Sequence, residues 1–361
     1  MIEQKIKTSN QNTTAEFPLG HCAGLRIIFM GTPEFAVAAL DKLLQGGCNI
    51  VGVVTAPDKA AGRGLQLQQS AVKRYAVEQG LHILQPEKLK NTAFLEALKS
   101  LQADLQIVVA FRMLPEIVWN MPPMGTVNLH GSLLPQYRGA APINWAIING
   151  EKKTGVTTFK LKQEIDTGDI LLTEVIPVGE EETAGELHDK MKEIGAELLL
   201  KTVRGLATGV LFEVPQISLH NPADEDVSAK RSDGDRQTVG VAGLKHAPKI
   251  FTETCQVNWN KPVDEVYNLV RGLSPYPAAF TFLEGKKLKV FKVHKVFAGE
   301  EADKVNKVYK VPTVAAGKWE TDKKTYLCFA CADGYISIKE LQLEGKKKMT
   351  IEDFLRGYRW G

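Results

Sequence analysis

From Leu25 onwards, short apolar runs alternate with amphipathic segments, and this alternation limits the folds open to the chain more than any other feature. RIIFMG is apolar throughout and ends at a glycine, as expected for a strand buried on both faces. TPEFAVAALDKLLQGG follows, with helical spacing, a proline in the first turn and two glycines at its end. NIVGVVTAP, LHILQP and DLQIVVAF repeat the strand pattern between helical segments. The sequence predicts an α/β, Rossmann-like fold with a mostly parallel sheet and helices on both faces.

This pattern continues to about Gln216, through GTVNLH, TGVTTFKL, DILLTEVIPV and the leucine-rich helical segment AGELHDKMKEIGAELLLKTVRGLATG. Residues 1–24 are polar and lack the apolar centre of a secretory signal peptide. Residues 221–247 contain few large apolar side chains, too few to order themselves by burial. We therefore expect a disordered extension at 1–24, a first domain at 25–216 and a linker at 217–248.

After the linker the sequence changes character. A helical segment, PVDEVYNLVRGL, precedes several short alternating segments, and Asp333-Gly334 between TYLCFACA and YISIKELQL is a strong signal for a two-residue hairpin turn. Thr350 and Asp353 resemble a capping box that opens a terminal helix. We expect residues 249–361 to form a second domain, an OB-like β-barrel.

The two predicted domains differ in charge. Lys245 to Gly361 contain 21 Lys and Arg against 14 Asp and Glu, a net charge of +7, whereas the preceding residues carry 24 against 28, a net charge of −4. A basic domain indicates contact with a polyanion. A solvated lysine-rich surface would have the same composition, and charge alone slightly favours this simpler interpretation.

Composition excludes several classes of protein. No apolar run approaches the roughly 18 to 20 residues of a membrane helix, so we expect no membrane association. The five cysteines are odd in number and scattered, which argues against a disulfide framework and is typical of the reducing cytoplasm. Cys328 and Cys331 form a CxxC inside an apolar strand pattern without a second cysteine pair, so we expect packing rather than zinc or redox chemistry.

The first strand-to-helix turn, MGTPEF, disfavours a dinucleotide-binding enzyme. That class needs G-x-G-x-x-G, because the second and third glycines let the pyrophosphate and the sheet approach closely. Only Gly31 is present here.

The stretch TVNLHGSLLPQYRGAAP contains the strongest candidate site. Asn128 and His130 are two apart on a predicted strand and so point the same way, at the strand end where open α/β sheets bind ligands. Each alone has a simpler interpretation, the Asn as a turn former and the His as a satisfied surface or core residue. Asp166 in EIDTGDILL is a third candidate if the chain returns to the same edge. It could also cap the turn at Thr167-Gly168, with Asp169 an equally plausible surface neighbour.

An amide, an imidazole and a carboxylate, without a nucleophilic Cys or Ser and without a metal, suit acyl transfer to an amine. The amine is itself the nucleophile, so no covalent enzyme intermediate is needed. The Asn128 amide can donate a hydrogen bond to the developing oxyanion. His130 and Asp166 can handle the protons that leave one nitrogen and reach the other.

These motifs resemble the folate-dependent formyltransferases. NLHGSLLPQYRGAAPI followed by DTGDIL carries the resemblance, together with RIIFMGTPEFA, APDKAAGRG and the basic C-terminal domain, and it runs from about Leu25 to the terminus. The resemblance implies transfer of a formyl group from 10-formyltetrahydrofolate to the α-amino group of methionine on initiator tRNA, a step of translation initiation. It implies catalytic roles for Asn128, His130 and Asp166.

The resemblance also implies a folate-contacting turn. We expect the two adjacent leucines of this turn to be exposed and to pack against the folate, while backbone groups supply polar contacts. A plain hydrophobic turn is the alternative. The turn consists of Ser132, Leu133, Leu134 and Pro135.

A third implied region is the loop APDKAAGRGLQLQQSAVK, which in the family reaches the acceptor end of tRNA. Arg63, and after it Lys59, are the candidate phosphate contacts, among glycines and alanines that permit close approach of the backbone. A flexible surface loop is the alternative. Many members have lysines where Leu65 and Gln66 stand, so the strength of this contact is open.

Other positions also depart from the family pattern. Arg112 could crowd or reshape the pteridine pocket, and Gln136 stands where an Arg is common. Members usually begin with Met where Leu25 stands, from which we hypothesise that translation starts at the Leu25 codon.

Several alternatives share parts of this pattern. Glycinamide ribonucleotide formyltransferases lack a basic second domain, aminosugar formyltransferases can carry a similar one, and a formyltetrahydrofolate hydrolase would use water in place of the amine. The loop AGRG and the lysine-rich tail favour tRNA. A nucleic-acid-binding protein built on an inactive α/β domain is the alternative from another class. For the formyltransferase acting on tRNA we expect a monomer without a metal.

Overall fold

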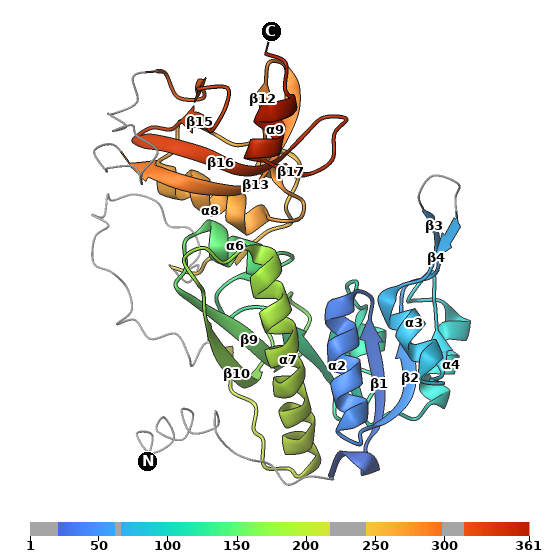
Figure 1. Cartoon of the computed structure of the whole chain (residues 1–361). Helices are drawn as coiled ribbons and strands as arrows, with labels where there is room; N and C mark the ends of the chain where they lie inside the picture. The colour runs from blue at the N-terminus through green and yellow to red at the C-terminus, as the bar shows by residue number, and fades with distance from the viewer. Residues whose placement is uncertain (1–20, 62–65, 217–242, 298–313, 361) are drawn as a thin grey trace, which may run out of the picture. The chain divides into compact units, whose positions relative to one another are not determined.

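The computed structural model describes residues 21–61, 66–216, 243–297 and 314–360 (Figure 1). Residue contacts divide the chain into two units. The N-terminal unit comprises Met1–Gly139, Thr154–Ile176 and Asp189–His246, and the C-terminal unit comprises Ala140–Lys153, Pro177–His188 and Ala247–Gly361. These units interleave along the sequence, and the domain boundaries expected at 25–216 and 249–361 stay a prediction.

A seven-stranded sheet forms the centre of the N-terminal unit, in the order β10-β9-β7-β6-β1-β2-β5. The pairs that β1 makes with β2 and β6, and β6 makes with β7, are parallel, whereas β9 runs antiparallel to β7. The sheet is therefore mostly parallel, as predicted, with a change of direction next to β7. Its strands are β1 (Arg26–Gly31), β2 (Asn49–Val54), β5 (Ile83–Leu84), β6 (Leu105–Val109), β7 (Thr126–His130), β9 (Lys153–Lys160) and β10 (Ile170–Pro177).

Helices pack on both faces of this sheet (Figure 1). On one face, Phe94 and Leu98 pack against Ile28 of β1 in a buried cluster. On the other face Gly195 lies close to Leu129 of β7, and a Cβ at Gly195 would be 3.0 Å from Leu129 Cδ2. Both layers were predicted from helical spacing. The helices are α2 (Glu34–Gln45), α3 (Ala71–Glu78), α4 (Thr92–Ser100), α5 (Glu116–Trp119) and α7 (Ala184–Ala207).

The end of the expected N-terminal extension is ordered. His21–Gly24 form a 3-10 helix, η1. Cys22 is fully buried, and its thiol donates to the carbonyl oxygen of Gly46 at 3.4 Å. Disorder was therefore a wrong expectation for these four residues, because an apolar side chain anchors them. Residues 1–20 lie outside the described part of the chain.

A curled antiparallel sheet forms most of the C-terminal unit, in agreement with the predicted OB-like domain (Figure 1). Its strand order is β12-β13-β16-β15-β14, and β17 pairs with β16. Trp259 and Phe329 stack at 4.7 Å inside its core, and the Trp259 indole donates to Thr281 Oγ1. The elements of this unit are α6 (Pro142–Ile148), η4 (Glu253–Cys255), α8 (Val263–Leu273), β12 (Ala279–Leu283), β13 (Lys286–Phe297), β14 (Trp319–Thr321), β15 (Leu327–Ala330), β16 (Gly334–Leu343), β17 (Met349–Thr350) and α9 (Ile351–Gly357).

Asp333 has a second role besides the predicted one. The predicted hairpin between β15 and β16 is present, but its two central residues are Ala332 and Asp333 rather than Asp333 and Gly334, because Ala330 pairs with Tyr335 and the Cys331 N–H donates to the Gly334 carbonyl at 2.8 Å. Asp333 also accepts a hydrogen bond from the backbone N–H of Val263 at 2.7 Å and so caps α8 from a distance in the sequence. The predicted cap of α9 is confirmed, since Thr350 Oγ1 accepts from the Asp353 N–H.

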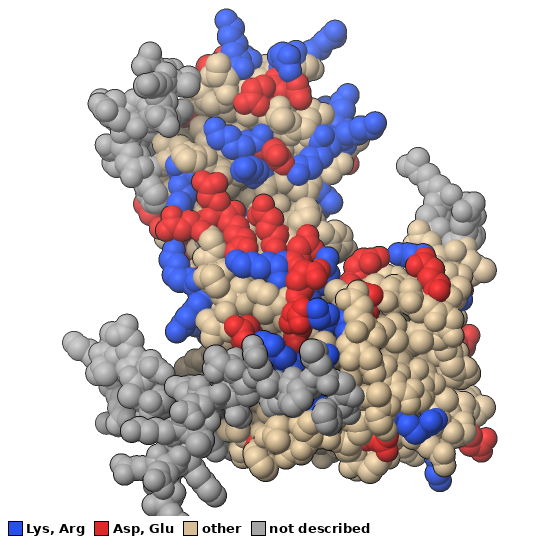
Figure 2. Space-filling view, turned by 60° about the horizontal axis from the view of Figure 1, so that its bottom comes forward, with Lys and Arg blue, Asp and Glu red and all other residues tan. Residues whose placement is uncertain are grey.

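Lysines gather on β13, where a register shift between Val290 and Lys292 interrupts the alternation of faces. Lys287 and Lys289 precede the shift and Lys292 follows it. In Figure 2, basic side chains are numerous on the C-terminal unit. Several of the basic side chains are already engaged within the unit; Lys295, for example, pairs with Asp264, and Lys348 pairs with Glu340.

Cys328 and Cys331 are both buried as free thiols, at 1% and 2% exposure. Burial raises the pKa of Cys331 to about 12, which keeps that group a neutral thiol. Among the described residues no cluster of three or more His, Cys, Asp or Glu could hold a metal ion. The described helices include none that is both long and apolar enough to cross a membrane.

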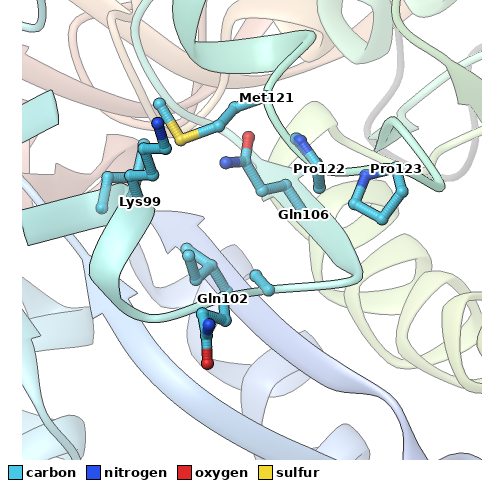
Figure 3. A pocket seen from close by; sticks show the side chains of 9 residues that line it. Lys99, Gln102, Gln106, Met121, Pro122 and Pro123 are labelled. Atoms are coloured by element: carbon cyan, nitrogen blue, oxygen red, sulfur yellow. The ribbon is translucent and has the colours of Figure 1, made fainter. Parts of the chain in front are cut away.

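One pocket of about 200 Å³ lies near the start of β6 (Figure 3). The start of β6 pairs with the start of β7, so this pocket is at the end of the strands away from His130. Gln106 is 1% exposed there, and its side-chain oxygen accepts from Thr126 Oγ1 at 3.1 Å. The lining includes Lys99, Met121 and Pro122 but none of the candidate site residues. This pocket is therefore separate from the candidate site.

Candidate active site

Strand β7 places Asn128 and His130 on the same face of the sheet. Leu129 between them faces α7, and strand alternation turns its two neighbours to the opposite face. Asn128 is half-buried between Val108 of β6 and Phe159 of β9, while His130 is 6% exposed at the end of the strand. The shared face that the sequence predicted is therefore present.

The two ring nitrogens of His130 have different partners. Nε2 lies 2.9 Å from the carbonyl oxygen of Tyr137, which can only accept, so Nε2 carries a hydrogen. Nδ1 lies 3.8 Å from Asp166 Oδ2. The ring meets Phe159 edge to face at 6.4 Å. With Nε2 committed to the Tyr137 carbonyl, Nδ1 is the ring nitrogen that faces the Asp166 carboxylate.

Asp166 reaches His130 by an unexpected path. β9 runs antiparallel to β7 and ends at Lys160 opposite Val127, so the following loop starts at the far end of β7 and must fold back. Asp166 has a φ of +54°, in the left-handed region. Its Oδ2 accepts from the Gly139 N–H at 2.9 Å. The carboxylate predicted to join the pair on β7 does lie beside His130.

Gly168 shows how tightly this loop packs. A Cβ at this position would lie 1.6 Å from the backbone oxygen of Lys160. Lys160 also receives the other end of the loop, because its N–H donates to the Asp169 carbonyl at 2.9 Å. The loop that carries Asp166 is therefore closed at its base.

The Ser132–Pro135 turn is fixed to β9 by one hydroxyl. Thr157 Oγ1 donates to the Ser132 carbonyl at 2.6 Å and accepts from the Leu134 N–H at 3.2 Å. Ser132 is fully buried, and its own hydroxyl donates to the Gln136 carbonyl at 2.6 Å. The Leu134-Pro135 peptide is cis. The Ser132 carbonyl, the Ser132 hydroxyl and the Leu134 N–H thus form hydrogen bonds within the protein that fix the conformation of the turn.

The expectation of two exposed leucines is wrong. Leu134 is 5% exposed and packs in a small cluster with Phe159 and Ile170. Leu133 is half-buried and fits over Gly155, where a Cβ would lie 2.4 Å from Leu133 Cδ2. The sequence could not show this, since the burial comes from β9 and β10, which approach from elsewhere in the chain.

Lys59 is exposed at the start of a short hairpin formed by β3 (Lys59–Ala61) and β4 (Gln66–Gln68). Arg63, the stronger of the two predicted tRNA contacts, lies outside the described residues, as does Leu65. The side chain of Asp58 ties down the base of this hairpin, because it accepts from Lys73 Nζ at 2.5 Å and from Gln85 Nε2 at 2.9 Å.

Two positions that depart from the family pattern have clear partners. Arg112 donates to the backbone oxygens of Pro86 and Glu87, and its guanidinium lies over the Phe111 ring at 5.5 Å. Burial lowers the pKa of Arg112. Gln136 Oε1 accepts from the backbone N–H of Lys245 at 2.9 Å. Both side chains therefore serve local structure.

Sequence reasoning missed three residues that support the site: Thr157, Arg138 and Gln216. Threonine is ordinary in a strand, and an isolated Gln after a proline carries no signal. Arg138 lies inside the quoted motif, but its partner Gln216 is 78 positions away. Burial lowers the pKa of Arg138, and the carboxylates of Asp166 and Glu164 oppose this effect.

Comparison with known proteins identifies the family. Residues 25–203 match the model of the formyl transferase family, and residues 249–359 match that of the formyl transferase C-terminal domain. The chain belongs to the formyl transferase family. The predicted resemblance to the formyltransferases is confirmed.

Relatives of this formyl transferase are similar over nearly their whole length. The methionyl-tRNA formyltransferase of Phocaeicola vulgatus is 53% identical over 341 residues, which cover 93% of this chain and 96% of the relative. That of Bacteroides fragilis is 49% identical over 338 residues, which cover 92% of this chain and 95% of the relative.

Solved structures confirm the fold of this formyl transferase. The sugar 3N-formyl transferase WlaRD has a TM-score of 0.59 at 18% identity, over 91% of this chain and 100% of that one. HypX from Aquifex aeolicus, in complex with tetrahydrofolic acid, has a TM-score of 0.56 at 18% identity, over 92% of this chain and 48% of that one. At such identities the likeness concerns the fold alone.

Proposed function

We propose that this formyl transferase moves the formyl group of 10-formyltetrahydrofolate to the α-amino group of methionine on initiator tRNA, and so acts as a methionyl-tRNA formyltransferase in translation initiation. The observation that carries the proposal is the 49% to 53% identity, over more than nine tenths of the chain, to relatives with that name. The match spans both family models, so it includes the basic C-terminal part as well as the candidate site.

The proposed chemistry follows from the three side chains around His130. The amine attacks the formyl carbon, its new C–N bond forms, and the bond to the folate nitrogen breaks. Asn128 donates its amide N–H to the oxygen of the former carbonyl, which gains negative charge as the amine adds. His130 takes the proton that the attacking amine releases and returns one to the leaving folate nitrogen, so the proton count balances.

Asp166 assists His130 through its position. Its Oδ2 lies 3.8 Å from Nδ1, close enough to stabilise an imidazolium and to tighten into a hydrogen bond when substrate is present. The Gly139 N–H holds the same oxygen in place. The carboxylate therefore both orients the ring and offsets its charge.

We place the folate along the turn of Ser132–Pro135. Leu133, the less buried of the two leucines, offers it an apolar contact, and Leu134 supports the turn from beneath. The tRNA acceptor end is assigned to the β3–β4 hairpin with Lys59 and Arg63, and the tRNA body to the basic C-terminal unit. The proposal further takes the protein to be a monomer in the cytoplasm and to need no metal.

Formylation assays with two single variants test these roles. Asn128→Ala and Asp166→Ala are each expected to lower kcat by about 100-fold or more, because each removes a group that acts on developing charge. Folding and tRNA binding should stay as in the wild type, as judged by thermal unfolding and a binding titration. Unchanged activity in both variants would refute the assigned roles.

Offering charged initiator tRNA beside an aminosugar nucleotide tests the acceptor. With a donor labelled in its formyl group, we expect labelled product only on the tRNA. Exclusive formylation of the sugar would replace the proposed function with that of an aminosugar formyltransferase.

A further inference from the structure

Gln216 is a buried amide that grips the loop carrying Asp166. It is 3% exposed, and its Nε2 donates to the backbone oxygens of Asp166 at 2.8 Å and Gly168 at 2.7 Å. These two carbonyls flank Thr167 at the tip of the loop. Both N–H bonds of the amide are therefore used on one turn.

The oxygen of the same amide holds a second element. Gln216 Oε1 accepts from Arg138 Nε at 3.1 Å and also from its Nη2. Arg138 directly precedes Gly139, whose N–H binds the Asp166 carboxylate. Gln216 thus holds the backbone of Asp166, and the Gly139 N–H holds its carboxylate. Both contacts connect Asp166 to the segment Arg138-Gly139, the first through the side chain of Arg138.

Asp166 needs such support. The left-handed backbone region is unfavourable for residues other than glycine, so contacts are needed to hold Asp166 in it. Gln216 is itself anchored, because Val214 pairs with Ile170 through two backbone hydrogen bonds of 2.8 Å. This bridge brings the segment directly before Gln216 alongside the loop.

We infer that Gln216 is a positioning residue that holds the Asp166 carboxylate within reach of His130 Nδ1. The inference rests on the proposed function for the role of Asp166, but the geometric part stands separately. Gln216 touches no reacting atom in this account and acts through Asp166 alone.

Two variants of Gln216 test the inference. Gln216→Leu removes all four hydrogen bonds, whereas Gln216→Glu keeps the size and the acceptor for Arg138 but loses both donors and faces two carbonyls with a carboxylate. Each is expected to lower kcat about 10- to 100-fold with KM for both substrates little changed, because a displaced carboxylate harms the chemical step rather than binding. If the leucine variant does not fold, the glutamate variant carries the test.

Gln106→Leu is the matched control. Gln106, which lines the pocket of Figure 3, is also a buried glutamine of the N-terminal unit with a side-chain hydrogen bond from Thr126, but it lies at the other end of the strands, away from His130. It should share any general loss of stability and keep kcat within about 3-fold of the wild type.

A double-mutant cycle separates positioning from a general structural effect. In an Asp166→Ala background, Gln216→Leu is expected to cause no further loss of the single-turnover rate, measured with excess enzyme. The reason is that no carboxylate is left to position. Losses that multiply in the double variant would overturn the inference.

Hydrogen exchange gives a readout that needs no activity. The Gly139 amide, bound to Asp166 Oδ2, is expected to lose about 10-fold or more of its protection in Gln216→Leu and to keep it in Gln106→Leu. Unchanged protection of Gly139 would overturn the inference. A wild type that formylates no tRNA would refute the proposed function and leave this geometric test intact.

Discussion

Single residues in the loop after β9 decide where the proposed catalytic carboxylate lies. Asp166 has a left-handed backbone, and two positions later Gly168 lies against the backbone of Lys160. The sequence DTGD indicates a tight turn, so the presence of a turn here was predictable. The crowding at Gly168 was not, since it depends on a strand that ends eight positions earlier in the sequence.

Gly168→Ala is therefore expected to be strongly unfavourable. The new methyl group would overlap the Lys160 carbonyl, which is backbone and cannot move aside without distorting β9. We expect a loss of about 1–3 kcal/mol in the free energy of unfolding, together with reduced formylation as Asp166 moves. Denaturant unfolding and kcat are the measurements.

Gly24→Ala is the control, because a Cβ there meets no atom within 4 Å. It should leave both quantities near those of the wild type. Equal stability of the Gly168→Ala and Gly24→Ala proteins would contradict the packing argument.

At the scale of elements, the β3–β4 hairpin depends on contacts at its base. Asp58 accepts hydrogen bonds from Lys73 and Gln85, which belong to α3 and to the segment after β5. The hydrogen bond from Lys73, followed by that from Gln85, lowers the pKa of Asp58 below its usual value of 3.8. The charged carboxylate is therefore the form that holds the hairpin.

Asp58→Asn should loosen the hairpin in a pH-dependent way. Since the pKa of Asp58 is lower in the folded state, its contribution is fully present above pH 3.8 and is lost as pH falls through the folded value. We expect faster hydrogen exchange in Lys59–Ala61 of the variant near neutral pH, and a difference from the wild type that shrinks well below pH 3.8. The same difference at both pH values would contradict this assignment.

Glu34→Gln provides the comparison for that experiment. Glu34 pairs with Arg74 of α3 at 3.0 Å, but both side chains are more than half exposed. An exposed pair of this kind contributes little, so exchange in the hairpin should not change.

Periodicity predicted the parallel strands and their helices but not the direction of β9. An apolar strand has the same pattern whichever way it runs, and its direction depends on the connection that precedes it. The hairpin predicted from Asp333-Gly334 is confirmed, but its turn is shifted by one residue, and the role of Asp333 in it was not predictable for a similar reason. Asp333 is a good turn residue locally, but its carboxylate caps α8, whose first turn is 70 positions away. Contacts between residues far apart in the sequence could not be predicted from the sequence alone.

At the scale of the whole molecule, the uneven distribution of charge along the chain predicts that tRNA and folate bind through different kinds of contact. The chain from Lys245 onwards carries a net charge of +7, against −4 before it. Phosphate contacts by such a surface release counterions, whereas the folate contacts proposed here involve an apolar turn and backbone groups. The two substrates should therefore respond differently to salt.

Raising salt from about 50 to about 200 mM is expected to weaken tRNA binding at least about 10-fold and folate binding by much less. Fluorescence titrations of each substrate against the full chain measure both affinities. Equal salt sensitivity of the two would contradict an electrostatic RNA surface.

The loop between β9 and β10 has a consequence for how related chains can vary. Its base is tied at Lys160 and Asp169, opposite Val127, yet its tip must double back to the His130 end of β7. Insertion or deletion of one amino acid would move the Asp166 carboxylate away from His130, whereas substitutions at the exposed positions 162–165 leave the span of the loop intact. We therefore expect the length of the β9–β10 loop to vary less among related chains than its amino-acid composition.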